Sequence, residues 1–304
     1  MLLFAPDGIG EVDASTDLVS VIITAVANHE HGPLRPGDIV VVTSKVVSKA
    51  ENRSASALDR ESAIAAESQA VVAQRGNLRI VRTQTGLILA AAGVDNSNVD
   101  PSRILLLPRD PDASAQRLAN DLSRAAGGDV GVIVSDTAGR PWRLGQTDHA
   151  IGAAGVRMLE PYAGQVDPYG NELAVTTMAV ADELAAAADL VKGKLAGRPV
   201  AVIRGRGDLV GTQPAGRLGA NAIVRSGRED LFSHGSREAV LAALCRSLGM
   251  PEAYEHLVGL SATEAAEVLL HRSVLGEEAS QLVRDLLAAA TALGEQNGTP
   301  EGQA

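Results

Sequence analysis

Residues 129–150 read DVGVIVSDTAGRPWRLGQTDHA, and their first part decides the type of fold. The run from Asp129 to Ser135 is short, apolar and rich in β-branched residues, and it ends in polar residues, which predicts a buried strand. Two further runs share this character and predict strands of the same kind: Asp38 to Thr43 (DIVVVT) and Pro199 to Ile203 (PVAVI).

Helical patterns lie between these runs and after them. Alternating strands and helices would by themselves favour a doubly wound parallel sheet. From about Ser236 the strand patterns stop, and the polar end, GEQNGTPEGQA, predicts a frayed tail. The expected helices are Ser56 to Gln74, Ser114 to Ala126, Val180 to Leu195, Ala253 to Leu270 and Glu277 to Leu293.

Composition limits the possible functions. The 304 residues carry a formal net charge of -10, which argues against a protein that grips nucleic acid or an anionic membrane surface. An anionic substrate would therefore need a local basic site or a metal. The single cysteine, Cys245, excludes an internal disulfide and favours a reducing cytoplasm, and we expect it to serve packing. We find neither a signal peptide nor an apolar run long enough to span a membrane.

Hydroxyl and ammonium groups gather after the first predicted strand. In GDIVVVTSKVVSKAEN (37–52), the strand runs directly into Ser44, Lys45, Ser48 and Lys49. Lysine acts as a compact positive charge on phosphate oxygens, and serine can donate a hydrogen bond. The cluster suits phosphate, with a solvated turn as the alternative.

Two further segments place carboxylates outside the predicted core. Asp136 and Thr137 directly follow the strand at 129–135, where a carboxylate can hold a hard cation beside a nucleotide. Alternatively, Asp136 caps a helix or pairs with Arg140. Asp95 and Asn98 lie in AAAGVDNSNVD (90–100), a composition that favours turns without any function.

The standard nucleotide-binding fingerprints are missing. There is no GxxxxGK[ST], and GRGDLVG from Gly205 has the wrong spacing for GxGxxG, so a P-loop enzyme or a Rossmann dehydrogenase is disfavoured. Asp182 and Glu183 stand at the start of a predicted helix, where acidic residues are favourable whatever the function. The residues alone thus indicate an enzyme that handles a phosphorylated ligand with a divalent metal.

Four segments in order resemble the coenzyme F420:L-glutamate ligase family. They are TSKVVSKAE (43–51), AAAGVDNSNV (90–99), SDTAGRPWRLGQTDHAIGAAG (135–155) and the long run from DPYGNEL to VIRG (167–205). The resemblance covers roughly residues 1–232. It implies an α+β fold with mixed sheets, an intertwined two-lobed ligase domain over 1–232, and a homodimer. Residues 233–304 would form a helical extension.

The resemblance implies that L-glutamate is joined to the terminal carboxylate of the precursor F420-0, at the expense of GTP. An acyl phosphate would be the intermediate, and GDP and phosphate would be released. Two other functions stay open: a GTP-dependent ligase for another carboxylated cofactor, and a non-catalytic regulator that binds GTP or the cofactor. Neither nucleic acid nor membrane is an expected partner.

The resemblance also assigns roles to individual residues. Asp95, Asp136 and Thr137 would hold divalent metal, two ions of Mg²⁺ or Mn²⁺, and K⁺ is a further candidate cofactor. Asp95, Asp136 and Lys49 would serve catalysis. GTP would contact Ser44, Lys49 and Asn98, together with the stretch Ile9, Gly10, Glu11 and Val12, where the family usually has Leu-Pro. Some relatives continue into a nitroreductase-like flavin domain, which residues 233–304 cannot form intact, so we expect no FMN.

Overall fold

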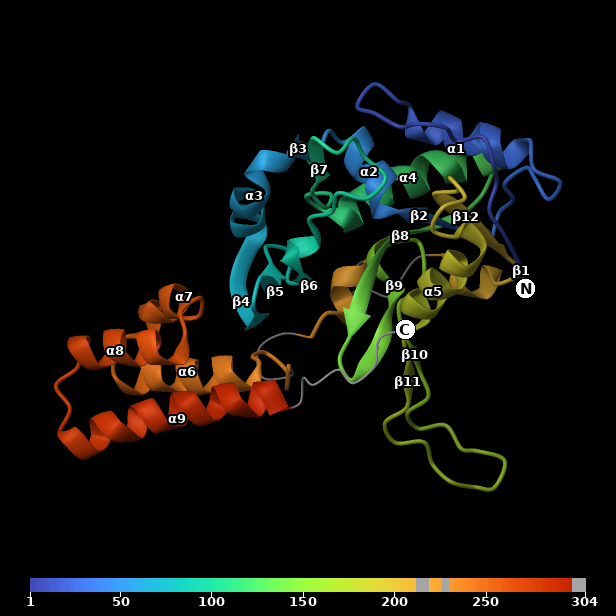
Figure 1. Cartoon of the computed structure of the whole chain (residues 1–304). Helices are drawn as coiled ribbons and strands as arrows, with labels where there is room; N and C mark the ends of the chain where they lie inside the picture. Colours follow the sequence, from blue (N-terminus) through green and yellow to red (C-terminus); the bar gives the residue numbers. More distant parts are fainter. Residues whose placement is uncertain (212–218, 226–229, 297–304) are drawn as a thin grey trace. The chain divides into compact units, whose positions relative to one another are not determined.

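The computed structural model describes residues 1–211, 219–225 and 230–296, and the chain in it forms two packed units. Unit 1 comprises residues 1–63 and 93–224, and unit 2 comprises 64–92 and 225–304. Both units mix strands with helices (Figure 1), which confirms the expected α+β class. No helix in the described part of the chain is long and apolar enough to cross a membrane.

Unit 1 is built on a five-stranded sheet with the order β1-β12-β2-β8-β9. Only the β2–β8 pair is parallel, and the β1–β12, β12–β2 and β8–β9 pairs are antiparallel. A doubly wound parallel sheet is therefore the wrong architecture. The strands are β1 (Leu2–Phe4), β2 (Ile39–Thr43), β8 (Gly131–Arg140), β9 (Arg143–Ala154) and β12 (Val200–Arg204).

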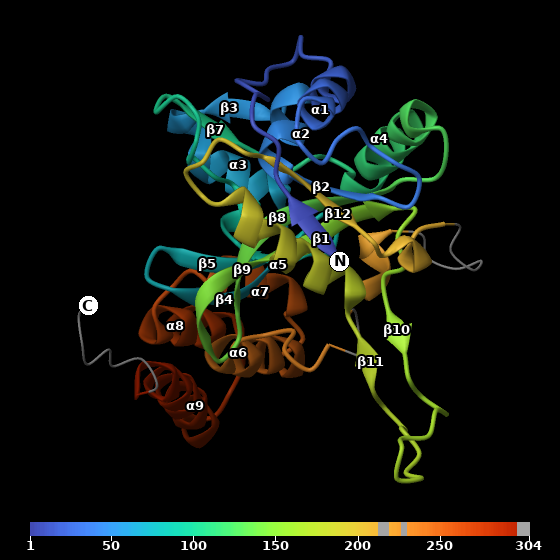
Figure 2. The ribbon, with the colours of Figure 1, turned by 90° about the vertical axis from the view of Figure 1, so that its right-hand side faces the viewer.

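Helices cover both faces of this sheet, as Figure 2 shows, with α5 on one face and α1, α2 and α4 on the other. Both faces of the central strands are buried, which explains why their sequences are continuously apolar. The helices are α1 (Leu18–Ala27), α2 (Ser44–Ala50), α4 (Pro111–Ala126) and α5 (Val180–Lys192). Small pairs complete unit 1: β3 (Ser54–Ser56) with β7 (Arg103–Leu105), and β10 (Glu160–Pro161) with β11 (Thr177–Met178).

Alanine fills the contact between α5 and the sheet. Ala181, Ala185 and Ala188 are fully buried there and pack with Ile133 and Ala201 of the strands. Because alanine is small, the helix can approach the sheet closely. Unit 1 also includes the short 3₁₀ helices η1 (Ala57–Asp59), η3 (Gly207–Leu209) and η4 (Ala220–Ile223).

Unit 2 joins a three-stranded antiparallel sheet to helices from the end of the chain. The hydroxyl of Tyr254 donates to the carbonyl of Val71 at 2.8 Å, and the Glu238 carboxylate accepts from the Gln74 amide at 3.2 Å. The strands are β4 (Ser68–Arg75), β5 (Leu78–Thr83) and β6 (Ile88–Ala90), and the helices are α6 (Ser236–Ser247), η6 (Pro251–Ala253), α7 (Tyr254–Leu257), α8 (Ala262–Arg272) and α9 (Glu277–Gln296).

Two segments cross between the units, α3 (Arg60–Glu67) and η2 (Ala91–Gly93). The helix expected over Ser56 to Gln74 is correct only for α3, because the chain becomes strand β4 from Ser68. The helical C-terminal stretch is confirmed. Cys245 is buried in its core, as expected, and the predicted tail lies mainly outside the described residues. The boundary at residue 232 between a ligase domain and an extension remains a prediction. The homodimer and the cytoplasmic location also remain predictions.

Candidate active site

Two parallel strands bring the polar segment at 43–51 and the segment that contains Asp136 together. Thr43, the last residue of β2, pairs with Ser135 within β8, so the residues that follow, Ser44 and Asp136, lie side by side where β2 ends. The sequence predicted that the second strand ends at Ser135, but β8 continues to Arg140, so Asp136 lies within it. The Ser44 hydroxyl donates to Asp136 Oδ1 at 2.6 Å. Ser44 is also the first residue of α2, so β2 passes into α2 at the site itself.

The turn after η2 brings a second carboxylate to the same place. Asp95 accepts hydrogen bonds from the amide and the hydroxyl of Ser97 at 2.8 and 2.9 Å. Its Oδ2 also forms an ion pair with the ammonium of Lys45 on α2. The turn thus has the Asx geometry expected from its composition, yet it also places a carboxylate near the end of β2.

Lys49, one turn further along α2, links two loops. Its ammonium forms an ion pair with Glu11 and donates to the backbone carbonyl of Asn98 at 2.9 Å. Asn98 has a positive φ of 57°, a conformation that asparagine tolerates better than most residues. In this structure Asn98 therefore contributes its main chain to the Lys49 contact.

A buried network lies on the other face of β8. Asp148 of β9 accepts from the Ser135 hydroxyl at 2.8 Å and from the Thr137 hydroxyl at 2.7 Å. Lys192, the last residue of α5, donates to Asp148 at 2.8 Å and to Ser135 at 2.9 Å. The side chains of Lys192 and Asp148 are only 1% and 3% exposed. Successive residues of a strand face opposite sides, so the side chains of Asp136 and Thr137 lie on different faces.

The charges of the site act on one another. Burial raises the pKa of Asp136 to about 6; the Ser44 hydrogen bond and Lys45 oppose this shift, while Asp148 and Asp95 add to it. Burial would also raise the pKa of Asp95, but the hydrogen bond from Lys45 and those from Ser97 bring it below its usual value. Of Asp95, Asp136 and Asp148, only Asp136 has a raised pKa, and a bound cation would stabilise its ionised form.

These groups surround a cavity of about 680 Å³. Ser44, Lys45, Lys49, Asp136 and Thr137 line one part of it. The end of α5 and the following loop contribute further lining residues: Lys192, Gly193, Lys194, Leu195, Gly197, Arg198 and Pro199. A cavity of this size suits a small-molecule substrate.

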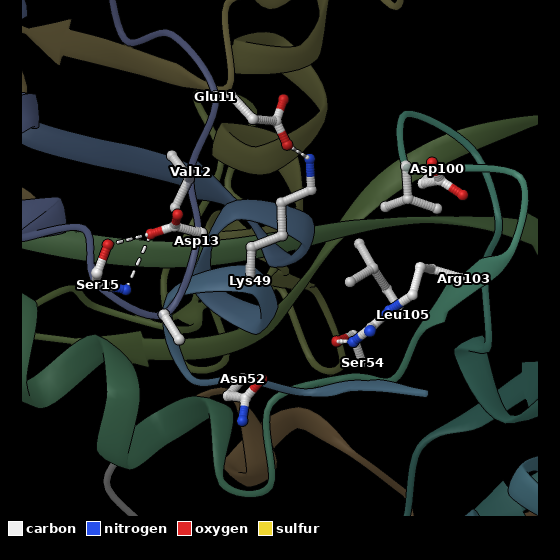
Figure 3. A pocket seen from close by; sticks show the side chains of 12 residues that line it. Glu11, Val12, Asp13, Ser15, Lys49, Asn52, Ser54, Asp100, Arg103 and Leu105 are labelled. Atoms are coloured by element: carbon white, nitrogen blue, oxygen red, sulfur yellow. Dashed lines mark hydrogen bonds and ion pairs between the residues drawn. The ribbon is translucent and has the colours of Figure 1, made fainter. Parts of the chain in front are cut away.

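A second cavity of about 460 Å³ shares four lining residues with the first: Glu11, Lys49, Val99 and Asp100. Figure 3 shows the Lys49 side chain reaching toward Glu11, with Arg103 and Ser54 on another side of the hollow. The Arg103 guanidinium donates to the Ser54 hydroxyl. This cavity combines cationic and hydroxyl groups with the carboxylates of Asp13 and Asp100, which are among its remaining lining residues.

The structure gathers most of the expected site residues. Asp95 is not a lining residue of the larger cavity, but it pairs with Lys45, which is. The expected residues that line this cavity are Gly10, Glu11, Ser44, Lys49, Asn98, Asp136 and Thr137. Val12 lines the smaller cavity, whereas Ile9 is a buried apolar residue that neither cavity includes. Asp136 accepts a hydrogen bond from Ser44. The alternative prediction paired Asp136 with Arg140, but these two described residues form no hydrogen bond or ion pair with each other.

Sequence reasoning missed Asp148 and Lys192. A usable pattern was present for the lysine, because Lys192 falls on the same helical face as the buried residues Ala181, Ala185 and Ala188. A lysine in the buried phase of an apolar helix needs an acidic partner. Asp148 has the corresponding pattern in β9, where it is the first buried residue after an exposed run.

The donor set fits a hard cation that is also held by substrate. No group of three or more His, Cys, Asp or Glu side chains among the described residues is arranged to hold a metal ion. The site instead offers the carboxylates of Asp95 and Asp136, together with hydroxyl oxygens. Mg²⁺ in nucleotide sites is typically bound by one or two carboxylates, with substrate phosphates and water completing its coordination.

Comparison with known proteins gives a consistent family. The family model for F420-0:gamma-glutamyl ligase matches residues 8–205. The coenzyme F420:L-glutamate ligase of Methanothermobacter thermautotrophicus is 39% identical over 223 residues, which cover 67% of this chain and 88% of that protein. The enzyme of the same name from Halobacterium salinarum is 39% identical over 229 residues, covering 67% and 87%, and that from Methanopyrus kandleri is 37% identical over 224 residues, covering 67% and 88%. This chain belongs to the F420-0:gamma-glutamyl ligase family.

Proposed function

We propose that this chain is a GTP-dependent ligase that joins the amino group of L-glutamate to the terminal carboxylate of the coenzyme F420 precursor. The observation that carries the proposal is the larger cavity at the end of β2 beside β8, where two ammonium groups lie near two carboxylates. Ammonium groups suit phosphate, and the carboxylates suit a divalent cation. The names of the relatives supply coenzyme F420 and L-glutamate, and the family resemblance supplies GTP.

The chemistry balances in two displacements. A carboxylate oxygen of the precursor attacks the γ-phosphorus of GTP, and GDP leaves with the electron pair of the broken bond. The glutamate amine then attacks the acyl carbon, phosphate leaves, and the amine loses a proton as the amide forms. A free carboxylate is a poor acyl donor, so the phosphorylation step is what makes the amide accessible.

The residues of the chain would position these groups and neutralise their charge. Lys45 and Lys49 are the ammonium groups placed to hold phosphate oxygens, and Ser44 is placed to donate a hydrogen bond. Asn98 would place Lys49 through its carbonyl. Gly10 and Glu11 line the same cavity and would contact the nucleotide. Positioning and electrostatic stabilisation together supply most of the catalysis of phosphoryl transfer.

Asp95 and Asp136 would hold one divalent metal, and Thr137, whose side chain lies on the other face of β8, would be an oxygen donor to a second. Bound Mg²⁺ or Mn²⁺ would neutralise negative charge on the phosphates. For the carboxylates to take up the metal, Lys45 must leave Asp95, and the phosphates offer its ammonium a new partner. We propose two such ions and a homodimer on the strength of the family alone.

Mass spectrometry tests the proposal directly. The purified protein is incubated with F420-0, L-glutamate, GTP and Mg²⁺ or Mn²⁺, and we expect a product heavier by one or more glutamyl units that needs both GTP and metal. Release of GDP and phosphate should match amide formed. If no product forms while a known ligase works in parallel, the same assay with other carboxylated cofactors tests a different acceptor. GTP binding without phosphate release with any acceptor would instead support a binding regulator.

A further inference from the structure

The buried Lys192–Asp148 pair has no place in the chemistry described so far, although it lies directly under the cavity. Taking two charges out of water is costly, and apolar residues of similar volume often stabilise a fold equally well. The pair is therefore weak evidence for a role in stability. Its hydrogen bonds indicate another role.

The donor and the acceptor in each hydrogen bond of Asp148 follow from the protons that its partners carry. Asp148 is ionised beside Lys192, so it can only accept. Thr137 has a single hydroxyl proton, and that proton is directed at Asp148 Oδ1 over 2.7 Å. The oxygen of Thr137 can then act only as an acceptor toward anything else. Because Thr137 lines the cavity, this acceptor is available to a bound cation.

Lys192 and Ser135 hold Asp148 in this state. The ammonium bonds Asp148 Oδ2 and the Ser135 hydroxyl, and that hydroxyl in turn donates to Oδ2. Both bonds to Oδ2 come from Lys192 and Ser135, and Oδ1 accepts the bond from Thr137. The positive charge of Lys192 also balances Asp148, so that this carboxylate need not take up a metal itself.

We propose that Asp148 and Lys192 are positioning residues that orient Thr137 as an oxygen donor to a divalent cation. The inference rests on the metal site of the proposed function. Outer groups of this kind orient the residues that touch a metal, and their loss typically weakens metal affinity by about 10- to 100-fold. Neither residue touches substrate in this role.

The test measures Mn²⁺ binding by electron paramagnetic resonance in the presence of GTP and without F420-0, relative to Mn²⁺ and GTP alone, so its result does not depend on ligase activity. Asp148→Asn and Thr137→Ala should each weaken Mn²⁺ affinity by about 10-fold or more. The double variant should be no weaker than either single variant, because the two residues act through one bond. Thr137→Ser keeps the hydroxyl and should restore affinity to near that of the unchanged protein.

Arg204→Lys is the matched control, because Arg204 forms an ion pair with the buried Asp38 on the same sheet. It should leave Mn²⁺ affinity unchanged even if it lowers thermal stability. Additive losses in the double variant, unchanged affinity in Asp148→Asn, or no Mn²⁺ binding by the unchanged protein with GTP present would overturn the inference. Protein that behaves as expected here but never ligates glutamate would overturn the proposed function alone.

Discussion

At the scale of single residues, Asp136 is the group on which the candidate site depends most. Asp136→Asn removes a negative charge but keeps an oxygen that can accept from Ser44, so the fold should remain intact. A metal contributes several kcal/mol of charge stabilisation, and each 1.4 kcal/mol is a factor of ten, so we expect turnover to fall by roughly 100-fold or more. Initial rates of glutamate addition measure the effect.

A matched control is Asp121→Asn, which changes a carboxylate on the exposed side of α4. It should retain full activity. Circular dichroism of both variants should match that of the unchanged protein. Normal turnover of Asp136→Asn would remove this residue from the metal site.

The raised pKa of Asp136 predicts how the metal requirement depends on pH. Burial, together with Asp148 and Asp95, raises this pKa to about 6, so below that pH the carboxyl group carries a proton that a metal must displace. Apparent metal affinity should therefore fall about tenfold per pH unit below 6 and level off above it. Rates at limiting Mn²⁺ test this: they should drop at acid pH and recover with added metal. Rates that stay constant down to pH 5 would contradict the assignment.

Lys49 should serve the nucleotide rather than the amine. Lys49→Ala removes one charge-assisted contact, which is worth about 1.5–3 kcal/mol, so the apparent KM for GTP should rise by roughly tenfold or more. Lys194→Ala is the comparison, because Lys194 is exposed and lines the same cavity. Substrate titrations of both variants give the answer. An unchanged KM for GTP together with unchanged turnover in Lys49→Ala would refute this role.

At the scale of elements, the sequence was sufficient where a run had one dominant character. The three apolar runs became β2, β8 and β12, since strands buried on both faces read as continuous apolar sequence. The expected helix over Ser56 to Gln74 failed from Ser68, where residues 68–75 pair with β5 and tertiary pairing overrides local pattern. The sequence also did not indicate strand direction: β12 is antiparallel to β2, although their apolar runs look alike.

The candidate site was predictable to the same extent. Ser44 and Asp136 follow predicted strands, so their neighbourhood follows from the parallel pairing of β2 and β8. The contact of Asp148 with Ser135 and Thr137 depends on the register between β8 and β9, which shifts between Val134 and Ser135. A one-residue slip moves every side chain to the other face of a strand, so residue types alone could not place Asp148.

The same network makes a prediction about the docking of α5. Lys192→Met leaves Asp148 buried without its cation, and breaking a buried pair in this way costs about 3–5 kcal/mol. We expect the free energy of unfolding to fall by that amount, measured by urea denaturation. Lys194→Met, two residues further along and exposed, should change it by less than about 0.5 kcal/mol. A stable Lys192→Met protein would mean that Asp148 is not charged in the fold.

At the scale of the whole molecule, the two units do not follow the order of the chain. The strands at 68–90 belong with the helices after residue 235, since the Gly235 amide donates to Val72 at 2.7 Å and Tyr254 bonds to Val71. Arg82 of β5 also forms an ion pair with Asp230 at 2.9 Å. Residues 1–232 alone would therefore contain the β4–β6 sheet without the helices α6–α9 that pack with it.

A protein truncated after residue 232 should consequently be unstable, even though it retains every residue of the candidate active site. Val72 and Val81 are buried in the complete chain, and a three-stranded sheet whose apolar groups are exposed tends to associate with other copies. We expect aggregation or rapid proteolysis between residues 64 and 92, detected by size-exclusion chromatography and limited trypsin digestion. Tyr254→Phe in the full chain removes a single hydrogen bond and should cost only about 1 kcal/mol. If the truncated protein were monodisperse, protease-resistant and fully active, the helices at 236–296 would be an independent addition, and the boundary expected at 232 would describe a self-sufficient ligase domain.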